Sequence, residues 1–135
     1  MITGIGIDIV QVKRMERWLN NTELLEKYFN NDELTYVLSR GKHAAQSLAA
    51  RFAAKEAFGK ALGTGFADIA LKDIMVINRE NGKPDIKLTG TAQKAFEKSG
   101  AQNVHISLSH ERDNAIAMVV LETLINNSLQ GLEGA

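Results

Sequence analysis

The segment at residues 44–62 constrains the fold of this 135-residue chain more than any other. It reads AAQSLAARFAAKEAFGKAL, and its alanines, leucines and phenylalanines occur all round the helical wheel. A helix with this pattern has little surface that can face water. Gly63-Thr64-Gly65 follows directly and ends the helix. The sequence therefore predicts a long central helix that other elements must cover.

Shorter elements are expected on both sides of this helix. Alternating or continuous apolar patterns predict strands, at residues 4–10, 74–79, 85–88, 104–109 and 115–121. Helical spacing predicts helices, at residues 11–20, 22–29, 32–40 and 91–98. Asn81-Gly82 is a strong signal for a hairpin turn. Residues 111–114 connect the two strands of a second expected hairpin. Because the strand at 115–121 is apolar at every position, both its faces are expected to be covered.

These runs predict an α+β fold, in which a long buried helix packs on a mainly antiparallel sheet. The expected domain organisation is one domain at residues 1–122, followed by a loose C-terminal tail at residues 123–135.

Composition excludes several classes of protein. Sixteen basic and sixteen acidic residues cancel, whereas a general nucleic-acid binder usually carries a basic excess. The chain has no cysteine, which excludes disulfides, thiolate metal sites and cysteine nucleophiles. No stretch approaches the roughly 18 apolar residues of a membrane span, and the N-terminus lacks the basic region of a signal peptide. We therefore expect a cytoplasmic protein that binds neither nucleic acid nor membrane.

Charged residues interrupt the central helix at Arg51, Lys55, Glu56 and Lys60. They need partners, because burying an isolated charge costs on the order of several kcal/mol. Glu56 and Lys60 lie four residues apart and so share one face of the helix. From spacing alone, they are either an internal ion pair or part of a charged site. Arg51 could likewise be a ligand contact, a surface charge, or a partner of the neighbours of Lys55.

Asp8 and the glycine loop are open to two interpretations as well. Asp8 lies within the first strand, where aspartate is disfavoured, and its same-face neighbours Gly4 and Gly6 would leave space for a metal or ligand. A helix-capping aspartate would give the same pattern. The loop at residues 63–65 offers donors that suit phosphate, although a glycine C-cap also explains it. Since this loop follows a helix C-terminus, the helix dipole does not favour an anion there, and Lys60 would have to hold it.

These features coincide in one family pattern. The strand GIGIDIV at residues 4–10 and the block RFAAKEAFGKALGTG at residues 51–65 resemble the holo-acyl-carrier-protein synthases, the small bacterial type of 4′-phosphopantetheinyl transferase. The turn NGKP at residues 81–84 and the segment VHISLSHERDNAIAMVVLE at residues 104–122 match as well. The resemblance implies the 4′-phosphopantetheinyl transferase fold. It also implies transfer of 4′-phosphopantetheine from coenzyme A to a serine of acyl carrier protein in fatty acid biosynthesis, with release of adenosine 3′,5′-bisphosphate.

The resemblance implies roles for particular residues. Asp8 and Glu56 would hold Mg²⁺, and Glu56 and Lys60 would be catalytic. The serine proton would pass either to Glu56 or to a metal-bound water. The phosphates of coenzyme A would be bound by Arg51, Lys60, Gly63, Thr64 and His110.

The resemblance also implies two protein partners. Basic and apolar residues of the first helix would dock the acidic acyl carrier protein, with Arg14 as the docking residue. Members of the family form trimers with active sites between subunits, so a homotrimer is expected, in which a neighbouring subunit could cover sheet surface.

Overall fold

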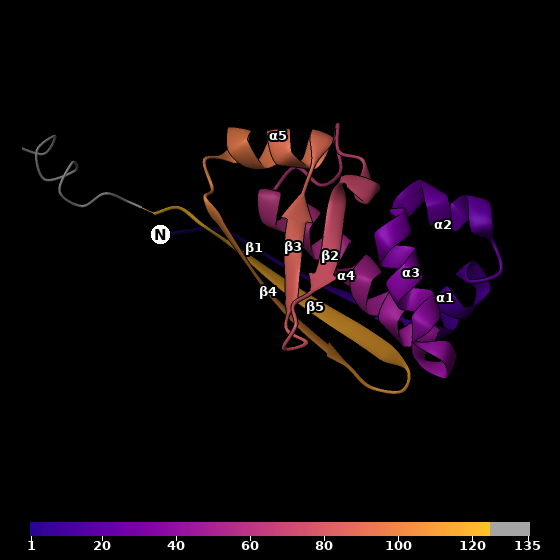
Figure 1. Cartoon of the computed structure of the whole chain (residues 1–135). Coiled ribbons are helices and arrows are strands. Elements are labelled where there is room, and N and C mark those ends of the chain that lie inside the picture. The colour runs from indigo at the N-terminus through magenta and orange to yellow at the C-terminus, as the bar shows by residue number, and fades with distance from the viewer. Residues whose placement is uncertain (125–135) are drawn as a thin grey trace, which may run out of the picture.

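Helix α4 (Ala44–Leu62) forms the centre of the computed structural model, which describes residues 1–124 (Figure 1). Most of its side chains are buried, on every side of the helix. Its many alanines allow strands and helices to approach closely from several directions. Gly63 ends the helix with a φ of 80°, the left-handed conformation of a glycine C-cap. The predicted long buried helix is confirmed.

A three-stranded antiparallel sheet packs against α4, in the order β1-β5-β4. Its strands are β1 (Ile2–Gln11), β4 (Asn103–His110) and β5 (Asn114–Glu122). Strand β5 lies in the middle and pairs with β1 through Gly6 opposite Val119. The predicted α+β class and the mainly antiparallel pairing are confirmed.

Glycines bring β1 against the backbone of α4. A Cβ atom on Gly4 would lie 1.9 Å from the carbonyl oxygen of Ala61, and one on Gly6 would lie 1.9 Å from that of Ala57. The expectation that these glycines leave open space beside Asp8 is therefore wrong. The helix backbone fills that space, and the glycines instead set how closely Asp8 approaches α4.

The remaining elements surround α4. Helices α1 (Val12–Trp18), α2 (Thr22–Tyr28) and α3 (Asn31–Ser39) form one group, seen at the right of Figure 1. A two-stranded antiparallel hairpin and a helix follow α4, as β2 (Ile74–Asn78), β3 (Pro84–Leu88) and α5 (Gly90–Ser99). Short 3₁₀ turns occur at Gly41–His43 and Leu71–Asp73. All predicted elements are present, although the first helix ends at Trp18 rather than at residue 20.

The face of the sheet that points away from α4 carries exposed apolar side chains. Ile5, Ile7 and Ile9 of β1 are 61%, 58% and 60% exposed. On β5, Ile116 and Met118 are 39% and 41% exposed. The expectation that both faces of the strand at 115–121 are covered is thus wrong for a single chain, because α4 covers only one of them. We refer to these five side chains as the isoleucine face.

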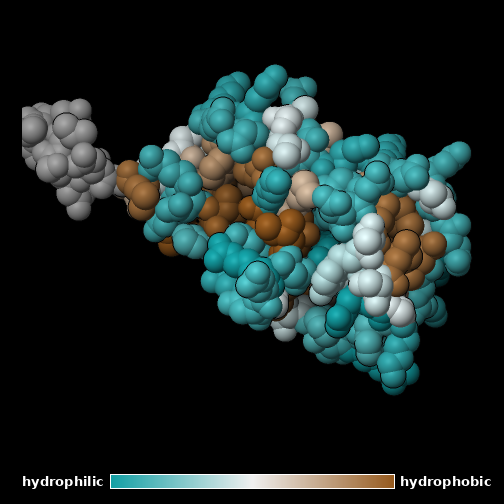
Figure 2. Space-filling model, in the orientation of Figure 1, coloured by the Kyte–Doolittle hydropathy of each residue, from teal (hydrophilic) through white to brown (hydrophobic). Residues whose placement is uncertain are grey.

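Hydrophilic residues dominate the side of the molecule drawn in Figure 2, and hydrophobic surface gathers below α5 and beside α1–α3. None of the described helices is both long enough and apolar enough to cross a membrane. The predicted tail lies outside the described residues, apart from Thr123 and Leu124.

Candidate active site

Asp8 and Lys60 form the first half of the candidate site. The Lys60 Nζ donates to Asp8 Oδ1 at 2.9 Å and to the backbone oxygen of Ile7 at 3.1 Å. The Lys60 side chain is 54% exposed and that of Asp8 is 18% exposed, so the pair lies at the surface over β1. The alternative of an internal Glu56–Lys60 pair is wrong, because the lysine points to the strand.

Glu56 shares this region with Asp8. Partial burial raises the pKa of Glu56, and the negative charge of Asp8 raises it further, while Lys60 and Arg14 act in the opposite direction. Asp8 and Glu56, which come from distant segments, are therefore close enough for the charge of one to act on the other. We refer to Asp8, Glu56 and Lys60 as the carboxylate cluster.

The donor set of this cluster fits Mg²⁺. This ion prefers one or two protein carboxylates and completes its shell with water and substrate phosphate oxygens. No group of three or more histidine, cysteine, aspartate or glutamate side chains is arranged as a metal site within residues 1–124. The cluster offers two carboxylates, the number that leaves several coordination positions for water and phosphate.

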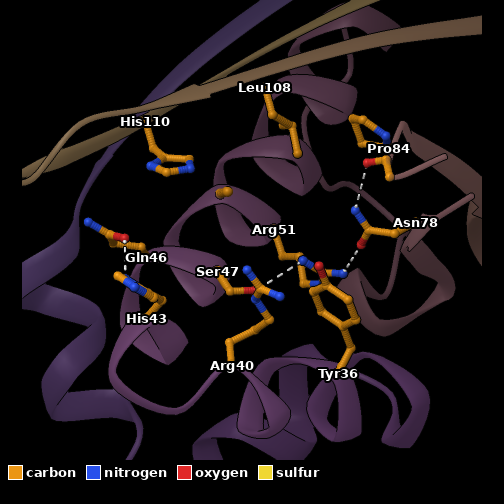
Figure 3. Close-up of a pocket in the computed structure, with 12 residues that line it drawn as sticks. Tyr36, Arg40, His43, Gln46, Ser47, Arg51, Asn78, Pro84, Leu108 and His110 are labelled. Atoms are coloured by element: carbon orange, nitrogen blue, oxygen red, sulfur yellow. Dashed lines mark hydrogen bonds between the residues drawn. The ribbon is translucent and has the colours of Figure 1, made fainter.

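Arg51 forms the second half of the candidate site. Only 4% of the residue is exposed, so the interpretation of Arg51 as a surface charge is wrong. Its guanidinium donates to Ser47 Oγ at 3.1 Å and to Asn78 Oδ1 at 2.6 Å, and it lies 4.2 Å from the ring centroid of Tyr36 (Figure 3). The buried Nε of Arg51 has no hydrogen-bond partner among the described residues. The guanidinium is therefore held in place by the side chains of Ser47, Asn78 and Tyr36.

Arg51 lines a cavity of about 410 Å³ whose other basic or imidazole groups are Arg40, His43 and His110. His110 reaches it from the end of β4, and Arg40 and His43 stand just before α4 (Figure 3). We call this the Arg51 pocket; its remaining lining residues are Tyr36, Gln46, Ser47, Ala50, Asn78, Gly82, Pro84 and Leu108. Several cationic donors around one cavity suit a phosphate-bearing ligand.

Of the residues that line the Arg51 pocket, the sequence predicted only Arg51 and His110. Arg40 and His43 come directly before the central helix, and this position next to a charged helix is a signal that could have been used. Tyr36 and Asn78 carry no such signal, because only the packing of α3 and β2 against α4 brings them to Arg51.

The two halves of the site lie on different sides of α4. At 3.6 residues per turn, Arg51 and Glu56 point in directions about 140° apart. One chain therefore brings together Asp8, Glu56 and Lys60, and separately Arg51 and His110, but it does not join the two groups. Gly63 and Thr64 follow Lys60 at the end of α4, where Thr64 lines another cavity, of about 510 Å³, beside α5.

Arg14 lies on α1 near the carboxylate cluster. Its guanidinium is 5.3 Å from the ring centroids of both Trp18 and Phe52, and it lowers the pKa of Glu56 against the larger effects of burial and Asp8. Arg14 itself is exposed. The predicted docking residue is thus held by aromatic rings beside the predicted metal ligands.

Known proteins are similar to this chain in sequence and in fold. Residues 4–119 match the 4′-phosphopantetheinyl transferase superfamily. A holo-[acyl-carrier-protein] synthase from Treponema denticola is 57% identical over 122 residues, covering 90% of this chain and 99% of that protein. The corresponding protein from Geotalea daltonii is 46% identical over 125 residues, covering 90% and 99%.

Solved structures agree with these sequence matches. The crystal structure of holo-[acyl-carrier-protein] synthase from Neisseria meningitidis superposes with a TM-score of 0.82 at 36% identity, covering 91% of this chain and all of that one. The structure of the protein from Bacillus anthracis in complex with coenzyme A (3′,5′-ADP) gives 0.77 at 36% identity, covering 92% and 99%. The chain therefore belongs to the 4′-phosphopantetheinyl transferase superfamily.

Proposed function

We propose that this protein is a holo-[acyl-carrier-protein] synthase, which transfers 4′-phosphopantetheine from coenzyme A to a serine of acyl carrier protein. The single observation that carries the proposal is the meeting of Asp8, Glu56 and Lys60 in a chain of this superfamily. A structural or purely partner-binding protein has no need for two neighbouring carboxylates at a partly exposed position. A coenzyme A binding module without turnover needs phosphate contacts but not both carboxylates.

Asp8 and Glu56 would hold Mg²⁺, for which their chemistry is suited. When bound, the ion supplies charge neutralisation at the pyrophosphate of coenzyme A. Lys60 would bind the same phosphate oxygens, since it lies one turn beyond Glu56 and its side chain is 54% exposed. Gly63 and Thr64 follow Lys60 and would add backbone and hydroxyl donors.

The reaction is an in-line displacement. The serine Oγ forms a bond to the pantetheine-bearing phosphorus, and the bond from that phosphorus to the bridging oxygen breaks. Adenosine 3′,5′-bisphosphate leaves with the electron pair. The serine proton passes to Glu56 or to water. The chain contributes positioning and positive charge, and it supplies no covalent nucleophile.

The Arg51 pocket would bind the remaining phosphate groups of coenzyme A. Arg51 and His110 are the predicted contacts, and Arg40 and His43 line the same cavity. Because this pocket and the carboxylate cluster lie on different sides of α4, one coenzyme A would reach both most directly across two copies of the chain.

The isoleucine face supports such an assembly. Three isoleucines about 60% exposed on one strand form apolar surface that a second copy can bury. We propose a homotrimer, as family resemblance suggests, with each active site shared between neighbouring subunits. Arg14 would dock the acidic carrier protein beside the carboxylate cluster. The protein would act in the cytoplasm, in fatty acid biosynthesis.

Mass spectrometry of apo acyl carrier protein tests the proposal. Incubation with this protein, coenzyme A and Mg²⁺ should add one phosphopantetheine to the carrier, and chelation of the metal should prevent the addition. A known synthase acting on the same carrier is the positive control. An unchanged carrier mass with an active control would reject transferase activity, and a thermal shift with coenzyme A would then indicate a binding module.

A further inference from the structure

A buried ion pair joins Lys55 of α4 to Glu33 of α3. The Lys55 Nζ lies 2.7 Å from Glu33 Oε1, and the two side chains are 0% and 1% exposed. Lys55 immediately precedes the predicted metal ligand Glu56, yet it points into the interior. None of the roles proposed above uses either residue.

The pair connects three elements through hydrogen bonds. Lys55 also donates to the backbone oxygens of Leu71, at 2.9 Å, and Ile74. Glu33 Oε2 accepts from the backbone nitrogen of Val76 at 3.1 Å. The ion pair thus joins α3 and α4 to the start of β2.

The same three elements meet again at Arg51. This residue of α4 contacts Tyr36 of α3 and Asn78 of β2. Arg51 lies four residues before Lys55 on α4, and Tyr36 lies three residues after Glu33 on α3, so each pair shares a helix face. Asn78 lies two residues after Val76 on β2 and therefore on the same side of the strand. Each residue around Arg51 thus lies one helical turn, or two strand positions, from a residue of the Lys55 contacts on the same element.

We infer that the Glu33–Lys55 pair is a positioning device for the Arg51 pocket, fixing Tyr36 and Asn78 around the guanidinium that receives a coenzyme A phosphate. This inference rests on the proposed function of Arg51. Apolar packing could hold the same elements together without the desolvation cost of a buried ion pair. The pair adds directional bonds, which fix the register of α3 and β2 against α4 more tightly than apolar contact does.

The test replaces both charges together, because removing one would leave the other buried and unpaired. The double variant Glu33→Leu/Lys55→Met should fold but bind adenosine 3′,5′-bisphosphate about tenfold more weakly in calorimetry. In the transfer assay its KM for coenzyme A should rise by a similar factor, with kcat changed less than about twofold. Glu33→Gln/Lys55→Met, which also removes both charges but keeps an acceptor at residue 33, provides the same measurement if the first double variant does not fold.

Phe58→Leu is the matched control for a general loss of stability. Phe58 is fully buried on the same helix and packs against Phe96 of α5. The variant Phe58→Leu should have a lower Tm than the wild type and the same affinity for adenosine 3′,5′-bisphosphate. Equal weakening by Phe58→Leu would show that the effect is not specific to the ion pair.

The Glu33/Lys55 double replacement is also made in a protein that carries Arg51→Met, to give a mutant cycle. There, the double replacement should cause no further loss of nucleotide affinity, because the group that it positions is gone. Equal losses in both backgrounds, or wild-type affinity in a folded double variant, would overturn the inference. Nucleotide binding is measured without a carrier protein, so absence of transfer by the wild type would reject the proposed function separately.

Discussion

The ammonium of Lys60 contacts the carboxylate of Asp8 at 2.9 Å, across a separation of 52 residues in the sequence. Glu56 lies one turn before Lys60, and partial burial, together with the charge of Asp8, raises the pKa of Glu56. The positive charges of Lys60 and Arg14 act in the opposite direction. Two carboxylates whose charges act on each other favour a divalent cation beside them.

Replacing either carboxylate should abolish transfer and preserve folding. Asp8→Asn and Glu56→Gln should each reduce kcat/KM at least about 100-fold, because each removes a metal ligand. Circular dichroism and Tm, within about 5 °C of wild type, should show that the fold survives. Glu97→Gln, an exposed change on α5, is the control and should leave both measurements unchanged. Unfolding of both site variants would mean that these carboxylates are structural.

Reversing the charge of Arg14 should weaken carrier recognition. Arg14→Glu is expected to raise KM for acyl carrier protein about tenfold and to reduce the salt dependence of the rate, since an exposed cation steers an acidic partner. Binding of coenzyme A, measured by calorimetry, should change much less. Lys94→Glu, on α5, is the matched control with the same charge change. Identical effects of both variants would point to overall charge rather than a docking surface.

Two inactive variants should restore activity when mixed, if active sites are shared between subunits. After unfolding and refolding together, Asp8→Asn and Arg51→Ala chains should recover up to about a quarter of wild-type activity by random assortment. Intact sites would combine Asp8 from one chain with Arg51 from its neighbour. Adding Ile7→Glu to both chains should prevent assembly and remove the recovery, as checked by light scattering. Recovery by unassembled chains, or none from correctly assembled mixed trimers, would contradict the shared site.

Enlarging Gly6 should destabilise the fold strongly. In Gly6→Ala the new Cβ would lie 1.9 Å from the Ala57 carbonyl oxygen, so β1 and α4 must separate. We expect a loss of about 1–3 kcal/mol or more in urea unfolding. Lys87→Ala, at an exposed strand position, should cost less than about 0.5 kcal/mol. Wild-type stability of Gly6→Ala would mean that this close approach relaxes easily.

The Arg79–Asp85 pair should make a small, pH-dependent contribution to stability. Partial burial acts to raise the pKa of Asp85, but the hydrogen bonds from Arg79 and Ile86 and nearby positive charges outweigh it, and the pKa is lowered. A lowered folded pKa stabilises the protein above the unfolded pKa, and this stabilisation is lost as pH falls through the folded value. Asp85→Asn should therefore lower Tm at neutral pH by less than about 5 °C. The difference from wild type should vanish in acid; a pH-independent difference would contradict this electrostatic account.

Local patterns in the sequence were sufficient for much of the fold. The all-round apolar helix at 44–62, its glycine end and the Asn81-Gly82 hairpin follow from periodicity and turn chemistry. The site was predictable only in part. Asp8 and Glu56 stand out as carboxylates within mainly apolar elements, but the importance of Tyr36 and Asn78 could not be read from their neighbours in the chain.

The sequence alone determined which residues are helical, which are extended and which charges interrupt a buried helix, because these properties depend on neighbours within one or two turns. Tertiary structure alone decided the partners of those charges. Lys60 contacts Asp8 and Lys55 contacts Glu33, over separations of 52 and 22 residues. Such pairings depend on how closely whole elements pack, and two glycines of β1 decide where Asp8 comes to rest on α4.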